Sequence, residues 1–382
     1  LSGHSCYTPR LGAMKGVLGD YFVADCSQFL ERRYEDPQWK VPEVIITWGQ
    51  NSTMGCPDGF FGHWVVDCMK RGTKIIAVEP RNTWLSSRAL HHLQLRPGTD
   101  GALALGMLNV IINEGLYDKD FVEHWTKGFD ELKEHVQDYS PEKVEKITSI
   151  PAEDIRKAAR MFGSIKPACI AQGINALDQH TNGLQNSRAI AILQAITANI
   201  DNPGGFITTS RVHLNPIRFP EKLSENPIGV DQYPLFYEVW GRLFGEGQAM
   251  VLPDVLLQNH PYPIKGMIIS ASNPLLTWPN SRKVEAALKQ LEFLVVMDIF
   301  MTETARLAHI VLPAATFLER TELCDYYGTI HGIPYVTLRK KVIDFPEAWP
   351  DLKFWFELAK RMGYDEYFPW KNVEEAIDYA LQ

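Results

Sequence analysis

The 382-residue chain lacks the features that mark several common classes of protein. No apolar run approaches the ~20 residues that a membrane-spanning helix needs, so we expect no direct membrane span. The formal net charge of -8 argues against a nucleic-acid-binding protein, which would present a basic face. No segment is of low complexity, and the contents of 45% hydrophobic and 22% charged residues are ordinary for a globular protein. The composition fits a soluble enzyme of two or three domains.

Cysteine is scarce, with six residues and no Cys-x-x-Cys pair. A zinc or iron–sulfur knuckle within this chain is therefore not expected. The even number would permit disulfides, but a chain with this much core material favours buried free thiols. Cys6 differs from the others because it lies in a Ser/Gly/His loop. A thiolate there could bind a soft metal or act as a nucleophile, although its spacing alone favours an inert thiol.

The chain begins at Leu1 without a methionine or a signal peptide. We expect it to be an interior piece of a longer protein. Its localisation, periplasmic or cytoplasmic, would then depend on an amino-terminal signal outside this piece.

Two stretches far apart in the sequence share one design. One apolar run ends at Gly49-Gln50-Asn51 and another at Ser272-Asn273-Pro274. Each is followed by a helical stretch and by a second apolar run that ends in an acid, Glu79 or Asp298. A strand, a turn, a helix and an acid ending the next strand make a nucleotide site of the Rossmann type. The sequence predicts an α/β protein with two Rossmann-like αβ domains and mostly parallel sheets, related as a pseudo-repeat.

We place the first αβ domain, with the Cys6 loop, at residues 1–185 and the second at 186–382. An irregular excursion, rich in Pro, aromatic residues and Asn, is expected over 202–263. The strand runs are apolar throughout, which indicates burial on both faces. Strands are expected at 43–48, 74–78, 93–96, 167–172, from 267, at 293–298 and at 309–312. Helices are expected at 16–30, 60–70, 102–113, 118–126, 129–137, 151–163, 182–199, 281–291 and 351–362.

Polar residues at the ends of the predicted strands are candidate ligand groups. Gly49 lets the backbone approach a phosphate or a ring, and Asn51 offers both a donor and an acceptor. The Glu79 carboxylate can accept hydrogen bonds from ribose hydroxyls or from a base with N–H donors, such as guanine. It could equally cap a helix or pair with Arg81. The counterparts in the second half are Ser272, Asn273 and Asp298.

Two turns and one later segment are harder to assign. Gly98-Thr99-Asp100 and Thr302-Glu303-Thr304 start helices whether or not they also supply an acid or hydroxyls to a phosphate. Gln179, His180 and Arg188 follow the strand that ends at Gly173. Exposed positions on the protein surface would account for these three residues unless a ligand-binding site lies nearby.

Taken together, these motifs resemble the molybdopterin oxidoreductase family that binds bis(molybdopterin guanine dinucleotide). This is the group of dimethyl sulfoxide reductase, formate dehydrogenase and thiosulfate or polysulfide reductase. The resemblance covers roughly residues 3–362, and the order and spacing of the motifs agree throughout. The motifs are WGQNS at 48–52, AVEPR at 77–81, RPGTDGALALGMLNVI at 96–111, GINALDQHTNG at 173–183, ITANIDNPGG at 196–205, SASNPL at 270–275 and DIFMTETARLAHIVLPAATFLER at 298–320.

The resemblance implies one guanine dinucleotide on each domain and a molybdenum or tungsten ion between them. Cys6 matches the protein ligand to that metal, which would join four dithiolene sulfurs. Arg188 matches an arginine near the metal in formate dehydrogenases, and His180 lies in a loop that the family brings to the pterin. One dinucleotide would be held by Asn51, Glu79, Arg81 and Asp100 and the other by Asn273, Asp298 and Thr302, with Gly49, Gly98, Gly173, Gln179 and Ser272 completing the cofactor-binding set.

The chain departs from the family pattern at several positions. Glu79-Pro80-Arg81 replaces the common Asp-Pro-Arg, and Tyr7 replaces the histidine that follows the metal ligand in formate dehydrogenases, which counts against formate. Ala308-His309 stands for Ala-Asp, and Asn51-Ser52 for Asn-Pro. We expect the 4Fe-4S cysteine cluster and the cofactor-capping domain of the family to lie outside this piece.

The predicted function is that of a catalytic-subunit fragment of a molybdenum or tungsten oxidoreductase in anaerobic respiration. A small-molecule substrate would react by atom transfer or hydride removal, and an iron–sulfur subunit would carry electrons away. A non-redox hydratase on the same cofactor and a non-catalytic relative, like the large subunit of respiratory complex I, remain alternatives. An NAD-dependent dehydrogenase is disfavoured because no Gly-x-Gly-x-x-Gly follows either first strand.

Overall fold

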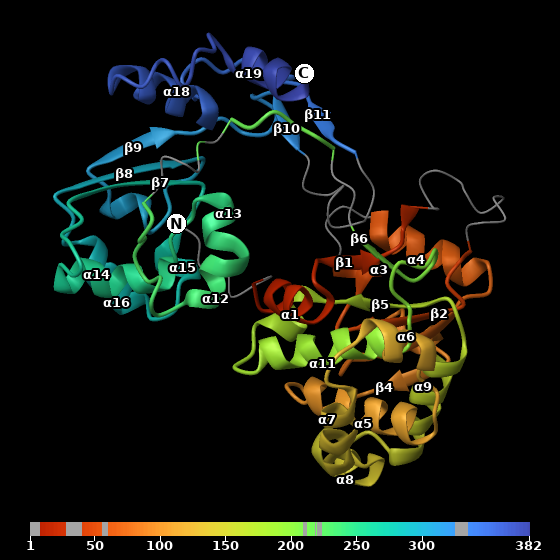
Figure 1. Cartoon of the computed structure of the whole chain (residues 1–382). Helices are drawn as coiled ribbons and strands as arrows, with labels where there is room; N and C mark the ends of the chain where they lie inside the picture. The colour runs from red at the N-terminus through yellow and green to blue at the C-terminus, as the bar shows by residue number, and fades with distance from the viewer. Residues whose placement is uncertain are drawn as a thin grey trace. The chain divides into compact units, whose positions relative to one another are not determined.

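The structure is a computed structural model of the chain (Figure 1) that describes residues 8–27, 40–55, 60–208, 212–217, 219, 224–324 and 335–382. It contains two compact units. The first unit comprises His4–Arg211 and Tyr326–Tyr335, and the second comprises Leu1–Gly3, Val212–Asp325 and Val336–Gln382. Each contains a parallel sheet with helices, so the predicted α/β class is confirmed. No helix in the described ranges is long and apolar enough to cross a membrane.

The structure divides the chain later than the expected boundary at 185/186. That boundary falls inside helix α11 (Gly183–Ile196), which packs against α1 (Thr8–Leu18) and α5 (Asp100–Asn113). Ile190 and Leu193 of α11 are buried in the core of the first unit. The whole helix therefore belongs to the first unit, because its apolar residues are covered there.

The sheet of the first unit has four parallel strands in the order β4-β3-β2-β5. Every residue of β2 and β5 is buried, as their apolar runs predicted. Trp48 aligns with Val78 and with Gln172, so the carboxyl ends of three strands meet at one edge. The strands are β2 (Val44–Trp48), β3 (Lys74–Val78), β4 (His91–Leu93) and β5 (Ala168–Gln172).

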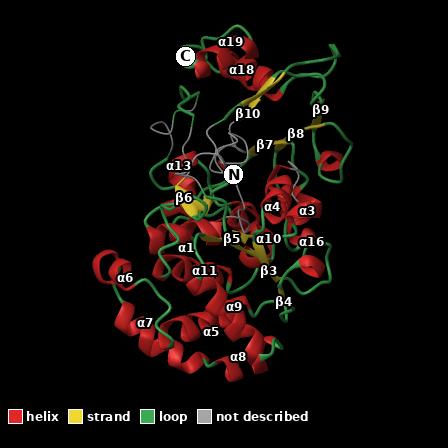
Figure 2. Cartoon of the chain, turned by 90° about the vertical axis from the view of Figure 1, so that its right-hand side faces the viewer, coloured by secondary structure: helices red, strands yellow, loops and turns green. Residues whose placement is uncertain are grey.

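Helices surround this sheet, and α5, α8 and α9 pack on one another (Figures 1 and 2). Beyond α1, α5 and α11, the unit has α3 (Ser52–Gly55), α4 (Phe60–Lys70), α6 (Lys119–Trp125), α7 (Phe129–His135), α8 (Pro141–Thr148), α9 (Ala152–Ser164) and α10 (Ile174–Asp178), with 3-10 turns η2 (Ser86–Arg88) and η3 (Val136–Tyr139).

Expectations about local structure were wrong at the amino end of the chain and in the excursion. The helix expected at 16–30 ends at Leu18, where Gly19 takes a positive φ of 82°, and strand β1 (Phe22–Ala24) follows. β1 pairs antiparallel with β6 (Phe206–Thr208), which begins the supposedly irregular excursion. That excursion also holds short helices, because buried apolar side chains stabilise them by packing. They are α12 (Pro234–Phe236), a π turn (Tyr237–Gly241), α13 (Arg242–Phe244), η6 (Ala249–Val251) and α14 (Leu252–Gln258).

The second unit is built on three parallel strands in the order β7-β8-β9 (Figure 1). Leu294 and Val296 of β8 pack in a core with residues of α14 and α16. The strands are β7 (Gly266–Ser270), β8 (Phe293–Asp298) and β9 (Ile310–Pro313). The other elements are α15 (Pro274–Thr277), α16 (Ser281–Leu288), η7 (Ala305–Leu307), the antiparallel pair β10 (Glu322–Cys324) and β11 (Thr337–Arg339), α18 (Asp351–Arg361) and α19 (Val373–Leu381).

Candidate functional site

Two glycines shape the edge where β2 and β5 of the first unit end. The Gly49 N–H donates to Val78 O and the Gly173 N–H to Trp48 O, both at 2.8 Å. Gly49 has a φ of +59°, and a Cβ there would lie 2.5 Å from Ala176 Cβ. A Cβ on Gly173 would collide with the Gly49 carbonyl oxygen. Both glycines therefore allow the two loops to pass in close contact.

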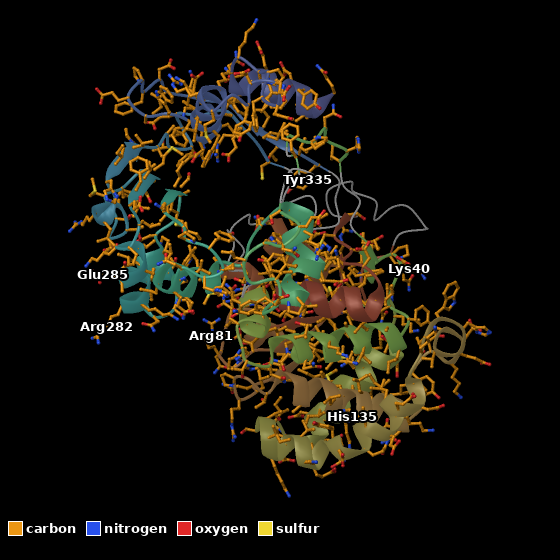
Figure 3. All side chains as sticks on the ribbon, turned by 60° about the vertical axis from the view of Figure 1, so that its left-hand side comes forward. Lys40, Arg81, His135, Arg282, Glu285 and Tyr335 are labelled. Atoms are coloured by element: carbon orange, nitrogen blue, oxygen red, sulfur yellow. The ribbon has the colours of Figure 1, made fainter. Side chains whose placement is uncertain are left out.

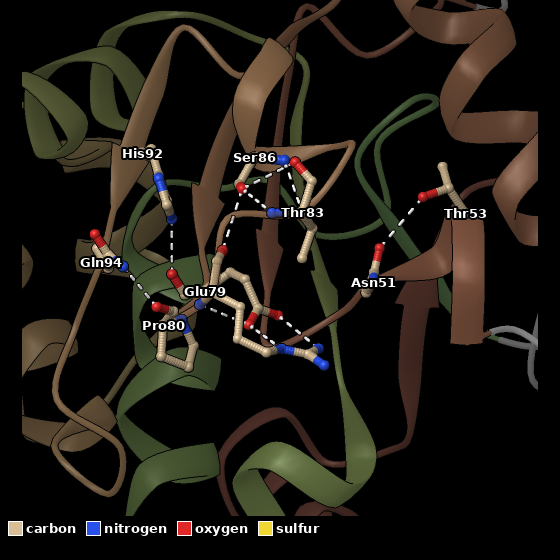
Figure 4. A network of polar contacts seen from close by, with 9 residues as sticks. Asn51, Thr53, Glu79, Pro80, Thr83, Ser86, His92 and Gln94 are labelled. Atoms are coloured by element: carbon tan, nitrogen blue, oxygen red, sulfur yellow. Dashed lines mark hydrogen bonds and ion pairs between the residues drawn. The ribbon is translucent and has the colours of Figure 1, made fainter.

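Asn51 follows at the same edge and starts the short helix α3. Its carbonyl oxygen accepts from the N–H of Met54 at 3.0 Å and of Gly55 at 2.8 Å. Its side-chain oxygen accepts from Thr53 Oγ1 at 3.2 Å (Figure 4). Asn51 is partly exposed. Asn51 thus stands at the start of α3, and its contact with a ligand remains a prediction.

Glu79 and Arg81 form an ion pair, which was one of the three interpretations of this acid. The Glu79 carboxylate accepts from Arg81 N at 3.0 Å and from Arg81 Nε at 2.9 Å. This hydrogen bond raises the pKa of the Arg81 guanidinium. The turn is held further by His92 Nε2, 2.7 Å from Glu79 O, and by Gln94 Nε2, which donates to Pro80 O at 2.7 Å (Figure 4).

Asp100 is a buried acid beside the same edge. Its Oδ1 accepts from Trp48 Nε1 at 2.9 Å, and burial raises the pKa of its carboxyl. A Cβ on Gly98 would lie 3.7 Å from His180 Nδ1, so His180 is brought next to this turn. Gln179 and Arg188 are exposed. Arg188 Nη1 donates to Gln185 Oε1 at 3.5 Å, as expected for a surface cation.

A buried polar group that the sequence analysis missed lies beneath these loops. Arg10 is buried on α1 and donates from Nη1 to Gln172 O at 2.9 Å. Gln172 Nε2 donates to Ser187 Oγ at 2.9 Å, and Ser187 donates to Asp178 at 3.2 Å. The sequence signal for this group was the position of Arg10, a cationic residue between Thr8 and the apolar residues 11–14. Cys6, the predicted metal ligand, precedes α1 and lies outside the described residues.

The second unit has a cleft of about 470 Å³ at the carboxyl ends of its three strands. Three of the predicted residues line it together: Ser272, Asn273 and Asp298. The sequence analysis missed Arg320 and Asp351, which also line it, together with the aromatic rings of Phe300 and Phe317. Arg320 Nη1 lies 2.6 Å from Asp351 Oδ2, and Ser270 Oγ donates to Asp351 Oδ1 at 2.6 Å.

Asn273 and Thr302 also have structural roles in this unit. Asn273 Nδ2 donates to Glu303 at 2.9 Å, which lowers the pKa of that carboxyl, and Asn273 Oδ1 accepts from Thr304 Oγ1 at 2.6 Å. Thr302 Oγ1 accepts from the Ala305 N–H at 3.1 Å, so it caps the η7 turn. Thr302 is not among the residues that line the cleft.

Metal-binding side chains do not cluster in the described part of the chain, where no group of three or more His, Cys, Asp or Glu could hold an ion. A family model matches most of the chain. Residues 27–361 match the model described as molybdopterin oxidoreductase. The chain belongs to the molybdopterin oxidoreductase family. Membership implies a molybdenum or tungsten pterin cofactor.

Curated relatives and solved structures are similar to this chain. It is 38% identical to "Acetylene hydratase" of Syntrophotalea acetylenica over 82% of this chain and 46% of that protein. It is 32% identical to "F420-dependent formate dehydrogenase subunit alpha" of Methanocaldococcus jannaschii over 96% of this chain and 52% of that protein. The structure of acetylene hydratase from Pelobacter acetylenicus superposes with a TM-score of 0.85 at 33% identity, covering 99% of this chain and 53% of that one. The chain thus spans about half the length of the relatives it matches.

Proposed function

We propose that this chain is part of the catalytic subunit of a molybdenum or tungsten enzyme that carries bis(molybdopterin guanine dinucleotide). Each unit would bind one guanine dinucleotide. The observation that carries the proposal is the cleft lined by Ser272, Asn273 and Asp298 where three parallel strands end. Its volume of about 470 Å³ is in the range of small-molecule sites, roughly 300–1,000 Å³.

The residues present fit such a ligand. Asp298 ends β8 with a carboxylate that can accept from the N1–H and amino groups of guanine. Phe300 and Phe317 offer rings against which a base can stack. In the first unit, Asn51, Glu79, Arg81, Asp100 and Gln179 are the corresponding candidates, with Gly49, Gly98 and Gly173 shaping the loops. When bound, the cofactor supplies a metal centre that changes oxidation state and binds substrate.

Cys6 is proposed as the protein ligand to the metal, with His180 and Arg188 near the reacting substrate. Changing Cys6→Ala in the full-length enzyme should lower turnover sharply while the fold and the metal content survive, because the dinucleotide contacts are untouched. X-ray absorption should show one sulfur fewer around the metal. Cys324→Ala, which removes a free thiol from strand β10, is the matched control. Unchanged turnover and sulfur coordination in Cys6→Ala would exclude this assignment.

The reaction is proposed to be a redox conversion of a small molecule, with electrons passing to a 4Fe-4S cluster and an iron–sulfur subunit outside this chain. Purified full-length enzyme should then exchange electrons with a viologen dye in proportion to product: it should reduce the oxidised dye if it oxidises its substrate, and oxidise the reduced dye if it reduces its substrate. It should also contain iron as well as molybdenum or tungsten. Iron-free enzyme, or product formed without either change in the dye, would contradict the redox proposal.

Hydration is the second candidate, because a relative at 38% identity and the solved structure are both acetylene hydratases. Addition of water moves no electrons to an external acceptor. Incubation with acetylene should therefore give product while the viologen stays oxidised. Absence of any product from acetylene would remove this candidate.

A further inference from the structure

We propose that Ser187 is a positioning residue. Together with Asp178 it holds the loop 179–182, and therefore His180, in place beside the carboxyl ends of the strands of the first unit. The inference rests on the proposed function, in which His180 lies near the reacting substrate. Ser187 itself is fully buried, so it acts through the loop and not on a substrate.

The loop between α10 and α11 has little of its own to hold it. All four residues of the loop 179–182 are polar and exposed, so burial of apolar side chains does not fix them. Two backbone hydrogen bonds join the loop to α11, from the Gly183 N–H to His180 O at 3.1 Å and from the Asn186 N–H to Asn182 O at 3.0 Å. The place of the loop on the protein is therefore decided by the buried residues that flank it.

Ser187 and Asp178 close the loop at its base. Ser187 Oγ donates to Asp178 Oδ1 at 3.2 Å and accepts from Gln172 Nε2 at 2.9 Å. A hydroxyl has one proton, so its donor is used by Asp178 while Gln172 uses one of its acceptor positions. All three side chains are buried, where a group that loses its hydrogen bond is costly. Because Asp178 and Ser187 stand on either side of the loop, their contact fixes the separation of its ends.

The same contact joins the loop to the sheet and to α1. Gln172 is the last residue of β5, and its carbonyl oxygen accepts from Arg10 Nη1 of α1 at 2.9 Å. α1 and α11 lie side by side, with side chains between them (Figures 1 and 3). A Cβ on Gly183 would collide with the Asp178 carbonyl oxygen, so α11 begins directly against the end of α10. The base of the loop therefore has little room to move.

Asn186, the neighbour of Ser187, holds the loop from a second side. Its Oδ1 accepts from the Gly101 N–H at 3.1 Å and from Asn182 Nδ2 at 3.2 Å. Gly101 lies in the first turn of α5, after the turn at Gly98 that lies next to His180. Two adjacent buried residues of α11 thus tie the loop to β5 and to α5. This arrangement keeps His180 beside the turn that precedes α5.

Hydrogen–deuterium exchange of the cofactor-free full-length protein tests the hold on the loop. Ser187→Ala should raise the exchange rates of the amides of residues 179–186 about tenfold, the factor expected for one lost buried hydrogen bond. The amides of β2 and β3 should keep their rates. Asp178→Asn retains an oxygen that can accept from Ser187, so it should raise the rates less than Asp178→Ala does. A rise throughout the first unit in Ser187→Ala would show a loss of global stability and overturn the inference.

Thr197→Val is the matched control, because it removes another buried hydroxyl directly after the same helix. Thr197 Oγ1 donates to Leu193 O at 2.8 Å, within its own segment, and does not contact the loop. This change should leave the exchange of residues 179–186 unchanged. The same local rise in Thr197→Val would also overturn the inference.

Turnover of the loaded full-length enzyme tests what the loop is held for, with formate plus a viologen dye and with acetylene as probes. On the probe that wild type converts, Ser187→Ala should lower kcat about tenfold and change KM by less than about twofold, because the geometry at His180 is lost while substrate contacts stay. In a His180→Ala background, Ser187→Ala should lower kcat no further, since it acts through His180.

A further loss of kcat in the His180→Ala background, or unchanged kcat in Ser187→Ala, would overturn the positioning role. Unchanged kcat in His180→Ala, or no conversion of either probe by wild type, would instead contradict the proposed function. The exchange measurement would then decide by itself whether Ser187 holds the loop.

Discussion

Asp100 is an ionisable group held almost entirely out of water at the start of α5. Burial is the main cause of its raised pKa, and the hydrogen bond from Trp48 Nε1 opposes the shift only in part. The charged carboxylate is therefore less favourable in the folded state than in the unfolded chain. This side chain therefore makes a pH-dependent contribution to the stability of the first unit.

We predict that Asp100→Asn gains stability relative to wild type as the pH rises. The folded-state pKa of Asp100 lies above its ordinary value of 3.8. Its favourable contribution is therefore complete below pH 3.8 and is lost as the pH rises through the folded-state pKa. Asn does not titrate and can still accept from Trp48. Urea unfolding of both proteins over a series of acidic to neutral pH values measures the difference.

Asp118→Asn is the control with the opposite sign. The Phe121 N–H and Lys166 lower the pKa of Asp118, so its contribution is present above 3.8 and disappears as the pH falls through the folded-state pKa. The loss in free energy of unfolding caused by Asp118→Asn should therefore become smaller at acidic pH. If the free energies of unfolding of Asp100→Asn and wild type differ by the same amount at every pH, the raised pKa of Asp100 does not affect stability and the prediction is wrong.

At the scale of elements, the site of the first unit depends on how closely two loops pass. The loops after β2 and β5 touch through Gly49 and Gly173, and the hydrogen bonds from these residues continue the sheet past its last strand residues. A side chain at Gly173 has no space, since the obstacle is a backbone carbonyl rather than a flexible group. The loop that carries Asn51 is therefore held in place by its contact with Gly173, the residue that follows β5.

Gly173→Ala should lower the free energy of unfolding by about 1–3 kcal/mol, as expected when a well-packed site is overfilled. It should also weaken cofactor retention, because the Gly49–Asn51 loop must move. Gly16→Ala is the control, since an added Cβ at that exposed position in α1 meets no atom within 4 Å. That change should stabilise the protein by about 0.5–1 kcal/mol. Equal stability changes in the two variants, measured by thermal and urea unfolding, would contradict this argument.

At the scale of the whole molecule, each unit has a proposed ligand-binding edge at the carboxyl ends of its parallel strands. In the second unit the cleft contains the ion pair of Arg320 with Asp351, which joins the segment after β9 to the start of α18. A ligand that binds these edges only in the folded state stabilises that state by mass action. Stability and cofactor content should therefore be coupled.

Removal of the cofactor should lower the Tm of the full-length protein. In Asp298→Asn the difference between loaded and cofactor-free protein should be smaller, because one contact with the ligand is lost. Glu285→Gln removes the same charge from α16, outside the cleft, and should keep the full difference. Calorimetric scans of all three proteins provide the measurement. A Tm that is independent of cofactor content would count against ligand sites in this chain.

The sequence pattern predicted helices and strands well where apolar residues follow one another in a run or recur at helical spacing. The strands 74–78 and 293–298 and the helix 60–70 occur as expected. The pattern failed where packing decides: at β1, whose partner β6 is far along the chain, and at β4, which lies at 91–93 rather than 93–96. The short helices between 234 and 258 failed for the same reason, because tertiary contacts stabilise them.

The sequence by itself determined the family, the parallel α/β class and the acids that end two corresponding strands, because apolar runs and turn residues act over short distances. Only the tertiary structure decided which groups these acids face. Glu79 forms an ion pair with Arg81, Asp100 accepts a hydrogen bond from Trp48, and Asp298 lines a cleft. Partners in a hydrogen bond are chosen by packing between distant segments, and burial then decides whether a charge serves the fold or a ligand.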